Sequence, residues 1–276
     1  MPGRLTLVGT PIGNLSDFSP RAIEALEACD FIAAEDTRVS LTLLNHFGIR
    51  KPLISYFEHN KRERGEIICR KIEDGENAVL VTDAGMPAIS DPGEDLVALC
   101  HERGISVTVI PGPSAGIAAL SLSGLPTARF TFEGFLSANR RTRREQLDSL
   151  KTEQRTMVFY EAPHKLLATL EDIHAAFGDR RICLAREITK LHEEIVRTTL
   201  TAAVDRYRDT PPRGEFVLVI EGAAPTAEKL LTPEEATVIA RSYLADGLSA
   251  SDAAKKAAAE TGVKKGDIYR LLIKET

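Results

Sequence analysis

The sequence predicts two α/β domains followed by a small all-helical tail with a helix-turn-helix-like pattern. Short apolar runs alternate with amphipathic segments over the first 220 or so residues, which is typical of α/β folds. The run Pro111-Gly112-Pro113 separates two such series. Further along, the chain becomes rich in Ala and Lys and follows a helical period. We therefore expect domains at residues 1–112, 113–223 and 229–276.

The first domain contains five apolar runs of strand length. The run at residues 78–82 is continuously apolar, which indicates a sheet covered on both faces. Ser19-Pro20 predicts a helix start, with Ser as the cap and Pro in the first turn. We expect a mostly parallel sheet with strands at residues 5–8, 31–34, 53–57, 78–82 and 106–110, and further helices at 37–47, 62–73 and 94–103.

The second series has the same alternation, and the tail has helix starts alone. In the second domain we expect strands at 130–135, 156–160, 182–186 and 216–220 and helices at 115–122, 140–150 and 165–177. Residues 193–199 are ambiguous but strand-like. In the tail, Thr232-Pro233 and Ser249 predict helix starts, and Gly262 predicts a turn before a third helix.

Bulk properties narrow the classes of protein. The net charge of −5 argues against a protein that coats nucleic acid nonspecifically, although a local basic patch would still suit a structured RNA. The four cysteines form no C-x-x-C pair, so we expect neither a metal site nor a disulfide framework. No apolar stretch reaches membrane-spanning length. We therefore expect a cytoplasmic protein without a membrane segment.

The most informative segment is the loop of residues 83–93, DAGMPAISDPG, which directly follows the buried strand at 78–82. Open α/β sheets bind ligands beyond the carboxyl ends of their strands. Asp83 suits a ribose hydroxyl or an ammonium group, and Gly85 lets the backbone approach a ligand closely. An ordinary connection made of turn residues is the alternative. Long loops in compact domains are usually functional, which favours a binding site.

Polar groups also follow the neighbouring strands. The loop after the first strand, at residues 9–15, lacks the Lys-Ser/Thr of a P-loop, so phosphate binding is poorly supported. Glu35, Asp36 and Arg38 follow the second strand, where Asp36 is either part of a site or the cap of the next helix. His59, in the segment of residues 56–60, belongs either to a base-stacking site or to a solvated loop.

The second domain repeats this arrangement of polar strand ends. Tyr160 and Lys165 follow one strand, Ala185 ends the next, and Glu215 precedes the last. The basic run at residues 140–144, with Lys61, Arg62 and Arg64, would either meet phosphates or form a solvated helix face.

Taken in order, several motifs resemble those of a known family. The segments are VGTPIGNLSD, AEDTR, FEHN, TDAGMPAISDPG, PGPSA, YEAPHK, ARE and GEFVLVIEG. They are similar to those of the small-subunit ribosomal RNA methyltransferases that modify a cytidine ribose 2′-hydroxyl, within the tetrapyrrole methylase superfamily. The resemblance covers nearly the whole chain. It implies two α/β domains with a cofactor cleft between them that holds S-adenosylmethionine. It also implies a homodimer, and 16S ribosomal RNA within the small subunit as substrate.

The resemblance also implies which residues serve the cofactor. Carried over by motif, the cofactor-binding residues are Thr10, Pro11, Asp83, Ala84, Gly85, Pro87, Ser90, Ser114, Ala115, Tyr160, Ala185 and Glu215.

The motifs leave the proton acceptor open. A ribose hydroxyl needs a base within hydrogen-bonding reach. The candidates are Glu35, Asp36 and His59, with Lys165 if burial lowers its pKa, and we favour the Glu35–Asp36 pair. Arg38 and Lys165 would anchor phosphate or hold the carboxylates.

Two other functions fit parts of the sequence. One is methylation of a small molecule such as a tetrapyrrole, although the basic run and the tail serve no purpose there. The other is a ligand-sensing regulator that reads nucleic acid with its tail. The basic residues of the tail are offset by acids, which argues against the regulator.

Overall fold

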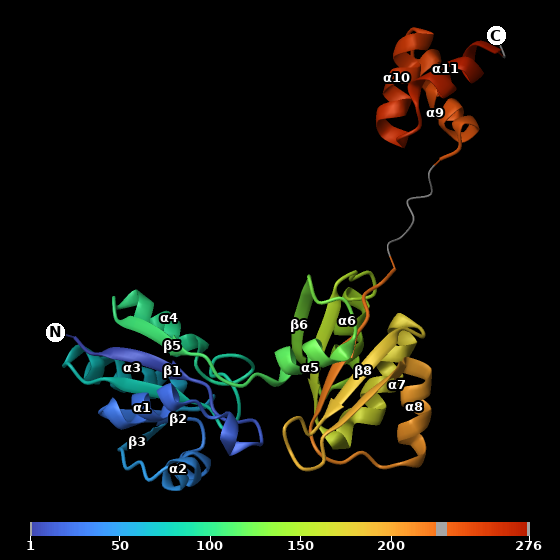
Figure 1. Ribbon diagram of the computed structural model, residues 1–276. Coiled ribbons are helices and arrows are strands. Elements are labelled where there is room, and N and C mark those ends of the chain that lie inside the picture. The colour runs from blue at the N-terminus through green and yellow to red at the C-terminus, as the bar shows by residue number, and fades with distance from the viewer. Residues whose placement is uncertain (1, 225–230, 275–276) are drawn as a thin grey trace. The chain divides into compact units, whose positions relative to one another are not determined.

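The computed structural model describes residues 2–224 and 231–274. The chain divides after Ala223 into two compact units. The first contains two sheets and their helices, and the second contains helices (Figure 1). The expected fold class, α/β with a helical tail, is confirmed. The tail boundary expected at residue 229 lies outside the described residues.

The first sheet is wholly parallel, with strand order β3-β2-β4-β1-β5. The carboxyl ends of its strands therefore share one edge, as ligand-binding α/β sheets require. Its elements are β1 (Arg4–Val8), α1 (Pro20–Ala28), β2 (Phe31–Ala34), α2 (Thr37–His46), β3 (Leu53–Ser55), α3 (Lys61–Glu73), β4 (Ala78–Val81), α4 (Glu94–Glu102) and β5 (Ser106–Ile110). Short 3-10 turns lie at Leu15–Asp17 and, in the second half, at Pro163–Lys165.

Helices cover both faces of the first sheet, because its central strands are apolar on both sides. Leu80 faces Ile68 and Leu96 of α3 and α4, whereas its neighbour Val79 faces Leu26 and Leu44 of α1 and α2. Successive strand residues point to opposite faces of the sheet, so a run of apolar residues requires helices packed on both faces. The continuous burial of β4 follows directly from the sequence at 78–81.

The second sheet has strand order β6-β7-β10-β8-β9. β6 pairs with β7 in parallel, and the other pairings are antiparallel. Its elements are α5 (Ala115–Ser123), β6 (Phe130–Phe135), α6 (Arg140–Ser149), β7 (Thr156–Glu161), α7 (Leu166–Phe177), β8 (Arg181–Arg186), β9 (Glu194–Thr199), α8 (Leu200–Asp209) and β10 (Phe216–Ile220). The ambiguous segment at 193–199 is thus a strand.

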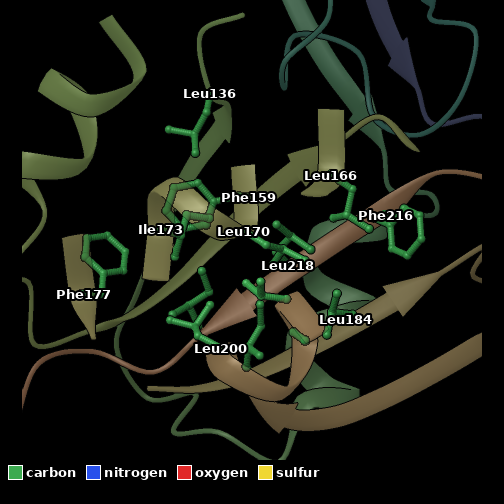
Figure 2. Packing of buried hydrophobic residues seen from close by; sticks show 14 of the residues in the cluster. Leu136, Phe159, Leu166, Leu170, Ile173, Phe177, Leu184, Leu200, Phe216 and Leu218 are labelled. Carbon is green, nitrogen blue, oxygen red and sulfur yellow. The ribbon is translucent and has the colours of Figure 1, made fainter. Parts of the chain in front are cut away.

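One face of the second sheet packs against α6, α7 and α8 (Figure 2). Phe159, Phe216 and Leu218 on the sheet meet Leu170 and Ile173 of α7. The opposite face packs against α5. Helix α8 was missed by the sequence interpretation, although its buried residues recur at helical spacing: Leu200, Ala203, Val204 and Tyr207.

The helical unit contains α9 (Pro233–Ala245), α10 (Ala250–Thr261) and α11 (Lys265–Lys274). Thr232 caps α9 with Glu235 in a reciprocal capping box, and Ser249 caps α10, so both predicted helix starts are confirmed. Gly262 takes a left-handed conformation at the end of α10, as the predicted turn requires. None of the helices among the described residues has the length and apolar character needed to cross a membrane.

Candidate functional site

A cavity of about 340 Å³ lies in the first unit, between loops at the carboxyl edge of the first sheet and residues of the second sheet. This volume lies in the usual range for small-molecule sites. Its wall contains Ile12, Glu35, Asp83, Ala84, Gly85, Met86, Ile89, Ser90, Asp91, Ser114, Ala115, Phe135, Tyr160, Glu161, Ala162, Ala185, Glu187, Ile188, Lys190, Glu215, Phe216 and Val217.

The loop after β4 forms one side of the cavity and carries backbone strain. Ala88 and Ser90 have φ values of 68° and 64°, which L-residues rarely adopt. A two-way backbone bridge ties this loop to the turn after β1. Thr10 N–H donates to Gly85 O at 2.9 Å, and Gly85 N–H donates to Thr10 O at 3.1 Å. Strain of this kind persists where the surroundings hold it, and it is common at ligand-binding sites.

Two glycines allow the turns after β1 and β5 to touch. A Cβ on Gly9 would lie 2.7 Å from the Gly112 Cα and 2.6 Å from the Met86 Sδ. Since real Cβ contacts are longer, neither turn accepts a side chain at this point without moving. The three loops after β1, β4 and β5 therefore pack as one rigid edge beneath the cavity.

Three carboxyl groups from this edge line the cavity: Glu35, Asp83 and Asp91. The Thr82 hydroxyl donates to Glu35 Oε2 at 2.6 Å. Burial and the nearby Glu35 carboxylate together raise the pKa of Asp91 to about 6. Burial also raises the pKa of Asp83. Asp91 is therefore a carboxyl group that changes charge close to neutral pH.

Asp36 does not line the cavity. It caps α2 by accepting the Arg38 N–H at 2.8 Å, and the Arg38 guanidinium binds the same carboxylate at 3.0 and 2.6 Å. These hydrogen bonds lower the pKa of Asp36 to about 2. Its backbone N–H donates to Asp83 Oδ1 at 3.1 Å. The geometry therefore favours the capping alternative and corrects our preference for Asp36 as part of the base.

Aromatic and buried ionic groups form the opposite wall. The Tyr160 hydroxyl accepts the Gly116 N–H at 3.1 Å, and the Tyr160 ring meets Phe132 and Phe135 edge-on. Burial raises the pKa of this tyrosine. At the end of β7, Glu161 is 2% exposed and pairs with Lys165 at 3.1 Å. Lys165 is not itself a wall residue, but it contacts two of them, Glu161 and the ring of Phe135.

A second group of ion pairs completes the wall, after the end of β8 and before the start of β10. The Lys190 ammonium binds Glu187 at 3.0 Å and Glu215 at 2.8 Å. Glu187, with a φ of 51°, also accepts the Glu215 N–H at 2.9 Å. A Cβ on Gly13 would lie 2.3 Å from Lys190 Cγ, so this lysine lies against the turn after β1.

The cavity wall is strongly acidic. Lys190 is the only cation among the described wall residues, against six carboxyl groups: Glu35, Asp83, Asp91, Glu161, Glu187 and Glu215. Such a wall favours a ligand that carries positive charge. In the described part of the chain, no three His, Cys, Asp or Glu side chains are grouped so that they could hold a metal ion.

The predicted site residues separate into two groups. Those in the wall are Glu35, Asp83, Ala84, Gly85, Ser90, Ser114, Ala115, Tyr160, Ala185 and Glu215. Those outside it are Thr10, Pro11, Asp36, Arg38, His59, Pro87 and Lys165. Thr10 is buried beneath the loop that it braces, with its hydroxyl donating to Thr82 O at 3.1 Å. His59 lies in a separate shallow depression with Asn60 and Arg62.

Sequence reasoning missed several wall residues. Asp91 was within the highlighted loop, and its carboxyl group between Ser90 and Pro92 was the available signal. Glu161 stood beside Tyr160, in a segment already noted. Glu187 stood in the motif ARE, already noted, and Lys190 follows it along the chain.

The chain matches the family profile described as tetrapyrrole (corrin/porphyrin) methylases over residues 4–204. It is 49% identical to ribosomal RNA small subunit methyltransferase I of a Synechocystis strain, covering 98% of this chain and 97% of that protein. The protein of the same name from Thermotoga maritima is 46% identical and aligns over 99% of its own length with 80% of this chain. A crystal structure of uroporphyrin-III C-methyltransferase from Thermus thermophilus, complexed with S-adenosyl homocysteine, is similar with a TM-score of 0.55 and 18% identity, covering 79% and 97% of the two chains.

Proposed function

Because the chain belongs to the tetrapyrrole methylase family and is closely related to ribosomal RNA small subunit methyltransferases I, we propose that it methylates a cytidine ribose 2′-hydroxyl in 16S ribosomal RNA. It is a methyltransferase that uses S-adenosylmethionine and acts on ribosomal RNA. The cytidine and its 2′-oxygen are the finer part of the proposal. The acidic cavity at the carboxyl edge of the first sheet is the observation that carries it.

The cavity residues fit S-adenosylmethionine, which supplies an activated methyl group on a positively charged sulfonium. Lys190 binds Glu187 and Glu215, and Lys165 pairs with Glu161. The other carboxyl groups of the wall, on Glu35, Asp83 and Asp91, add negative charge that suits a ligand with sulfonium and ammonium charges. The strained loop with Asp83, Gly85 and Ser90 would hold the cofactor from the first domain. Ser114, Ala115, Tyr160, Ala185 and Glu215 would hold it from the second.

Asp91 is the residue that we assign to proton acceptance. A ribose hydroxyl is a weak nucleophile, and the acceptor works best when its pKa lies near the working pH. The pKa of Asp91 is about 6, so its carboxylate is ionised at neutral pH but binds a proton more strongly than an ordinary aspartate. Glu35, held by the Thr82 hydroxyl, keeps negative charge beside it. An Asp91 carboxylate oxygen would accept the hydroxyl proton, while the sulfonium would supply the methyl group through cleavage of its S–CH3 bond and remain as a neutral thioether.

The remaining predicted residues support these groups. Arg38 holds Asp36, and Asp36 in turn fixes Asp83 through its backbone N–H. Lys165 balances the charge of buried Glu161.

The other two functions have less support. The likeness to porphyrinoid methyltransferase structures is below 25% identity and indicates a shared fold. The relatives that match at full length carry a ribosomal RNA name. The methylase family profile covers residues 4–204 and does not include the tail, which favours an enzyme over a regulator that depends on the tail.

We also propose that the enzyme is a cytoplasmic homodimer that acts on the small ribosomal subunit. Exposed apolar side chains on the edge strand β6 and the adjacent α5 support a dimer: Phe130 and Phe132 are 38% exposed, and Ile117 is 51% exposed. Light scattering of the purified protein at micromolar concentration should give twice the chain mass of 30.1 kDa.

The test of the function is mass mapping of ribose methylation in small-subunit ribosomal RNA. Cells with and without the gene are compared, and the mutant is complemented with the wild-type gene or with Asp91→Asn. We expect one cytidine to lose its 2′-O-methyl group without the gene and to regain it with the wild type alone. Unchanged ribose methylation in the mutant would contradict the proposal.

A further inference from the structure

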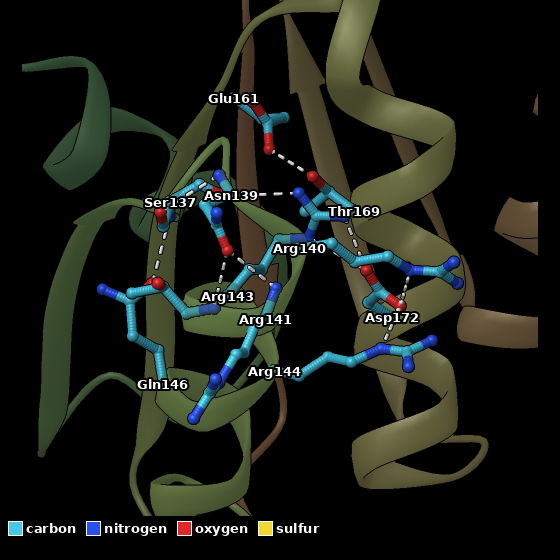
Figure 3. Close-up of polar contacts among 11 residues, drawn as sticks. Ser137, Asn139, Arg140, Arg141, Arg143, Arg144, Gln146, Glu161, Thr169 and Asp172 are labelled. Carbon is cyan, nitrogen blue, oxygen red and sulfur yellow. Dashed lines mark hydrogen bonds and ion pairs between the residues drawn. The ribbon is translucent and has the colours of Figure 1, made fainter.

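Three arginines of α6 converge on one buried carboxylate of α7 (Figure 3). Arg143 binds Asp172 Oδ2 through Nε at 3.0 Å and through Nη2 at 2.6 Å. Arg144 Nε binds Asp172 Oδ1 at 3.0 Å, and Arg140 Nε lies 3.4 Å from the same oxygen. The Asp172 side chain is 2% exposed. Although burial opposes ionisation, hydrogen bonds from Arg143 and Arg144 lower the pKa of Asp172 overall. The single Asp172 carboxylate therefore holds the guanidinium groups of three arginines.

The three arginines differ in their exposure and in which of their guanidinium nitrogens form hydrogen bonds. The Arg143 side chain is 6% exposed, and its Nη1 donates to Ser137 O at 3.2 Å. This arginine is a structural partner of Asp172. The side chains of Arg140 and Arg144 are 66% and 54% exposed and reach Asp172 only through Nε. Within the described residues, their terminal Nη groups have no hydrogen-bond or ion-pair partner.

Nearby acidic side chains do not neutralise these two guanidiniums, because the acidic side chains pair with other cations. Around α6, Arg141 pairs with Glu145 at 2.9 Å, and Lys151 pairs with Asp148 at 2.6 Å. On α7, Glu171 pairs with Arg208 at 3.3 Å. Three arginines on one aspartate leave a net charge of about +2 at an otherwise balanced surface, on a protein whose net charge is −5.

This cluster lies close to the cavity. Glu161, a wall residue, accepts the Thr169 hydroxyl of α7 at 2.6 Å. Asp172 follows Thr169 by three residues, which is about 4.5 Å along a helix. Phe135 of β6, also in the wall, precedes the loop that leads into α6. The cluster is thus linked to the cavity wall through Thr169 and Glu161, and the loop after Phe135 leads into the helix that carries its arginines.

We propose that Arg140 and Arg144 bind backbone phosphates of the ribosomal RNA that flank the target nucleotide. This inference rests on the proposed function and adds the surface that holds the substrate. Guanidinium groups bind phosphate in a planar, two-pronged geometry. Asp172 restrains both side chains through Nε and leaves the Nη donors outward, so less side-chain freedom is lost on binding. Binding here would position the strand without reading its sequence.

The test measures binding to small ribosomal subunits isolated from cells that lack the gene, at salt concentrations from 50 to 200 mM. The variants are R140Q/R144Q and, as a control, R141Q/K151Q, which removes the same charge from neighbouring paired positions. Each lost phosphate contact should lower the slope of log K against log salt by about 0.7–0.9. We expect R140Q/R144Q to lower the slope by about 1.5 and to weaken binding about tenfold or more, with the control within about twofold of wild type.

Two further measurements separate substrate binding from a structural role. Calorimetric affinity for S-adenosylmethionine and the unfolding midpoint should stay close to wild type in R140Q/R144Q. R140K/R144K should recover most of the salt slope, because it keeps the charge, but bind more weakly than wild type. A lysine variant that loses as much slope as the glutamine variant would count against phosphate binding.

The outcomes also separate this inference from the proposed function. If the wild type binds and methylates the subunit, and R140Q/R144Q has the same slope and affinity as R141Q/K151Q, the phosphate contacts are refuted and the function stands. If the wild type binds S-adenosylmethionine but neither binds nor methylates the subunit, both proposals are refuted.

Discussion

The substitution Asp91→Asn tests the proposed proton acceptor through both stability and rate. The pKa of Asp91 rises from its usual 3.8 to about 6 in the folded protein. Each pKa unit corresponds to about 1.4 kcal/mol, so ionising this group costs the folded state up to about 3 kcal/mol. Partial exposure to solvent reduces this cost, and we expect about 1–3 kcal/mol. Asparagine has nearly the same shape and carries no charge.

The sign of the pH dependence follows from the raised pKa. The folded state binds this proton more tightly than the unfolded chain, so the favourable contribution is complete below pH 3.8 and is lost as the pH rises through 6. At pH 7.5 the wild type therefore bears the full cost of ionisation, and Asp91→Asn avoids it. The advantage of the variant should shrink by up to about 2 kcal/mol between pH 7.5 and pH 4.5.

Urea unfolding at these two pH values measures the stability, and single-turnover methyl transfer measures the rate. We expect the variant to be more stable than wild type at pH 7.5 and slower in transfer by about 10²–10⁴-fold. The wild-type rate should rise about tenfold between pH 5 and pH 7, as the carboxylate ionises. A variant that is no more stable, and that retains the rate and pH profile of wild type, would refute the assignment of Asp91.

Three further predictions follow from the contacts described above. Asp83→Ala should weaken S-adenosylmethionine binding by about tenfold while leaving the unfolding midpoint nearly unchanged, and unchanged affinity in calorimetry would remove Asp83 from the cofactor site. Gly9→Ala should destabilise the protein by about 1–3 kcal/mol because its Cβ would overlap the neighbouring turn, whereas Gly266→Ala, in open space on α11, should be neutral or slightly stabilising in the same urea titration. Arg143→Ala should lower the free energy of unfolding by about 3 kcal/mol because Asp172 loses its buried partner, and a loss below 1 kcal/mol would contradict the structural role of that pair.

The sequence predicted the first half of the site well because parallel strands end at one edge. Polar groups after β2 and β4 were expected to meet, and Glu35 lies beside Asp83, accepting the Thr82 hydroxyl. The loop at 83–93 was expected to bind a ligand because of its length and turn residues, and its strained backbone lies in the cavity wall. The alternation of strands and helices was sufficient for this part of the fold.

The second half was harder to predict because its sheet is mostly antiparallel. The start of β10 lies beside the ends of β7 and β8, with Phe216 opposite both Glu161 and Arg186. This arrangement brings Glu215 close to Glu187 and Lys190. Sequence periodicity shows where a strand lies but not its direction, so it could not place these three charged residues together.

Side-chain direction was the other limit. Asp36 is adjacent to Glu35 in sequence, yet one faces the cavity and the other caps α2. Both arrangements satisfy the same residue pattern, since a helix N-terminus accepts an aspartate as readily as a site does. Side-chain direction also separates the arginines of the basic run at 140–144. Arg143 is buried against Asp172, whereas Arg140 and Arg144 are exposed.

Calorimetric titration with S-adenosylmethionine tests most directly whether this cavity is the methyl-donor site. We expect one binding site per chain in the wild type. We expect no measurable binding in Ala185→Leu, which places three additional carbon atoms on a cavity-wall residue that is 1% exposed. Wild-type binding that survives unchanged in the folded Ala185→Leu variant, or no binding by the wild type, would contradict the assignment of this cavity.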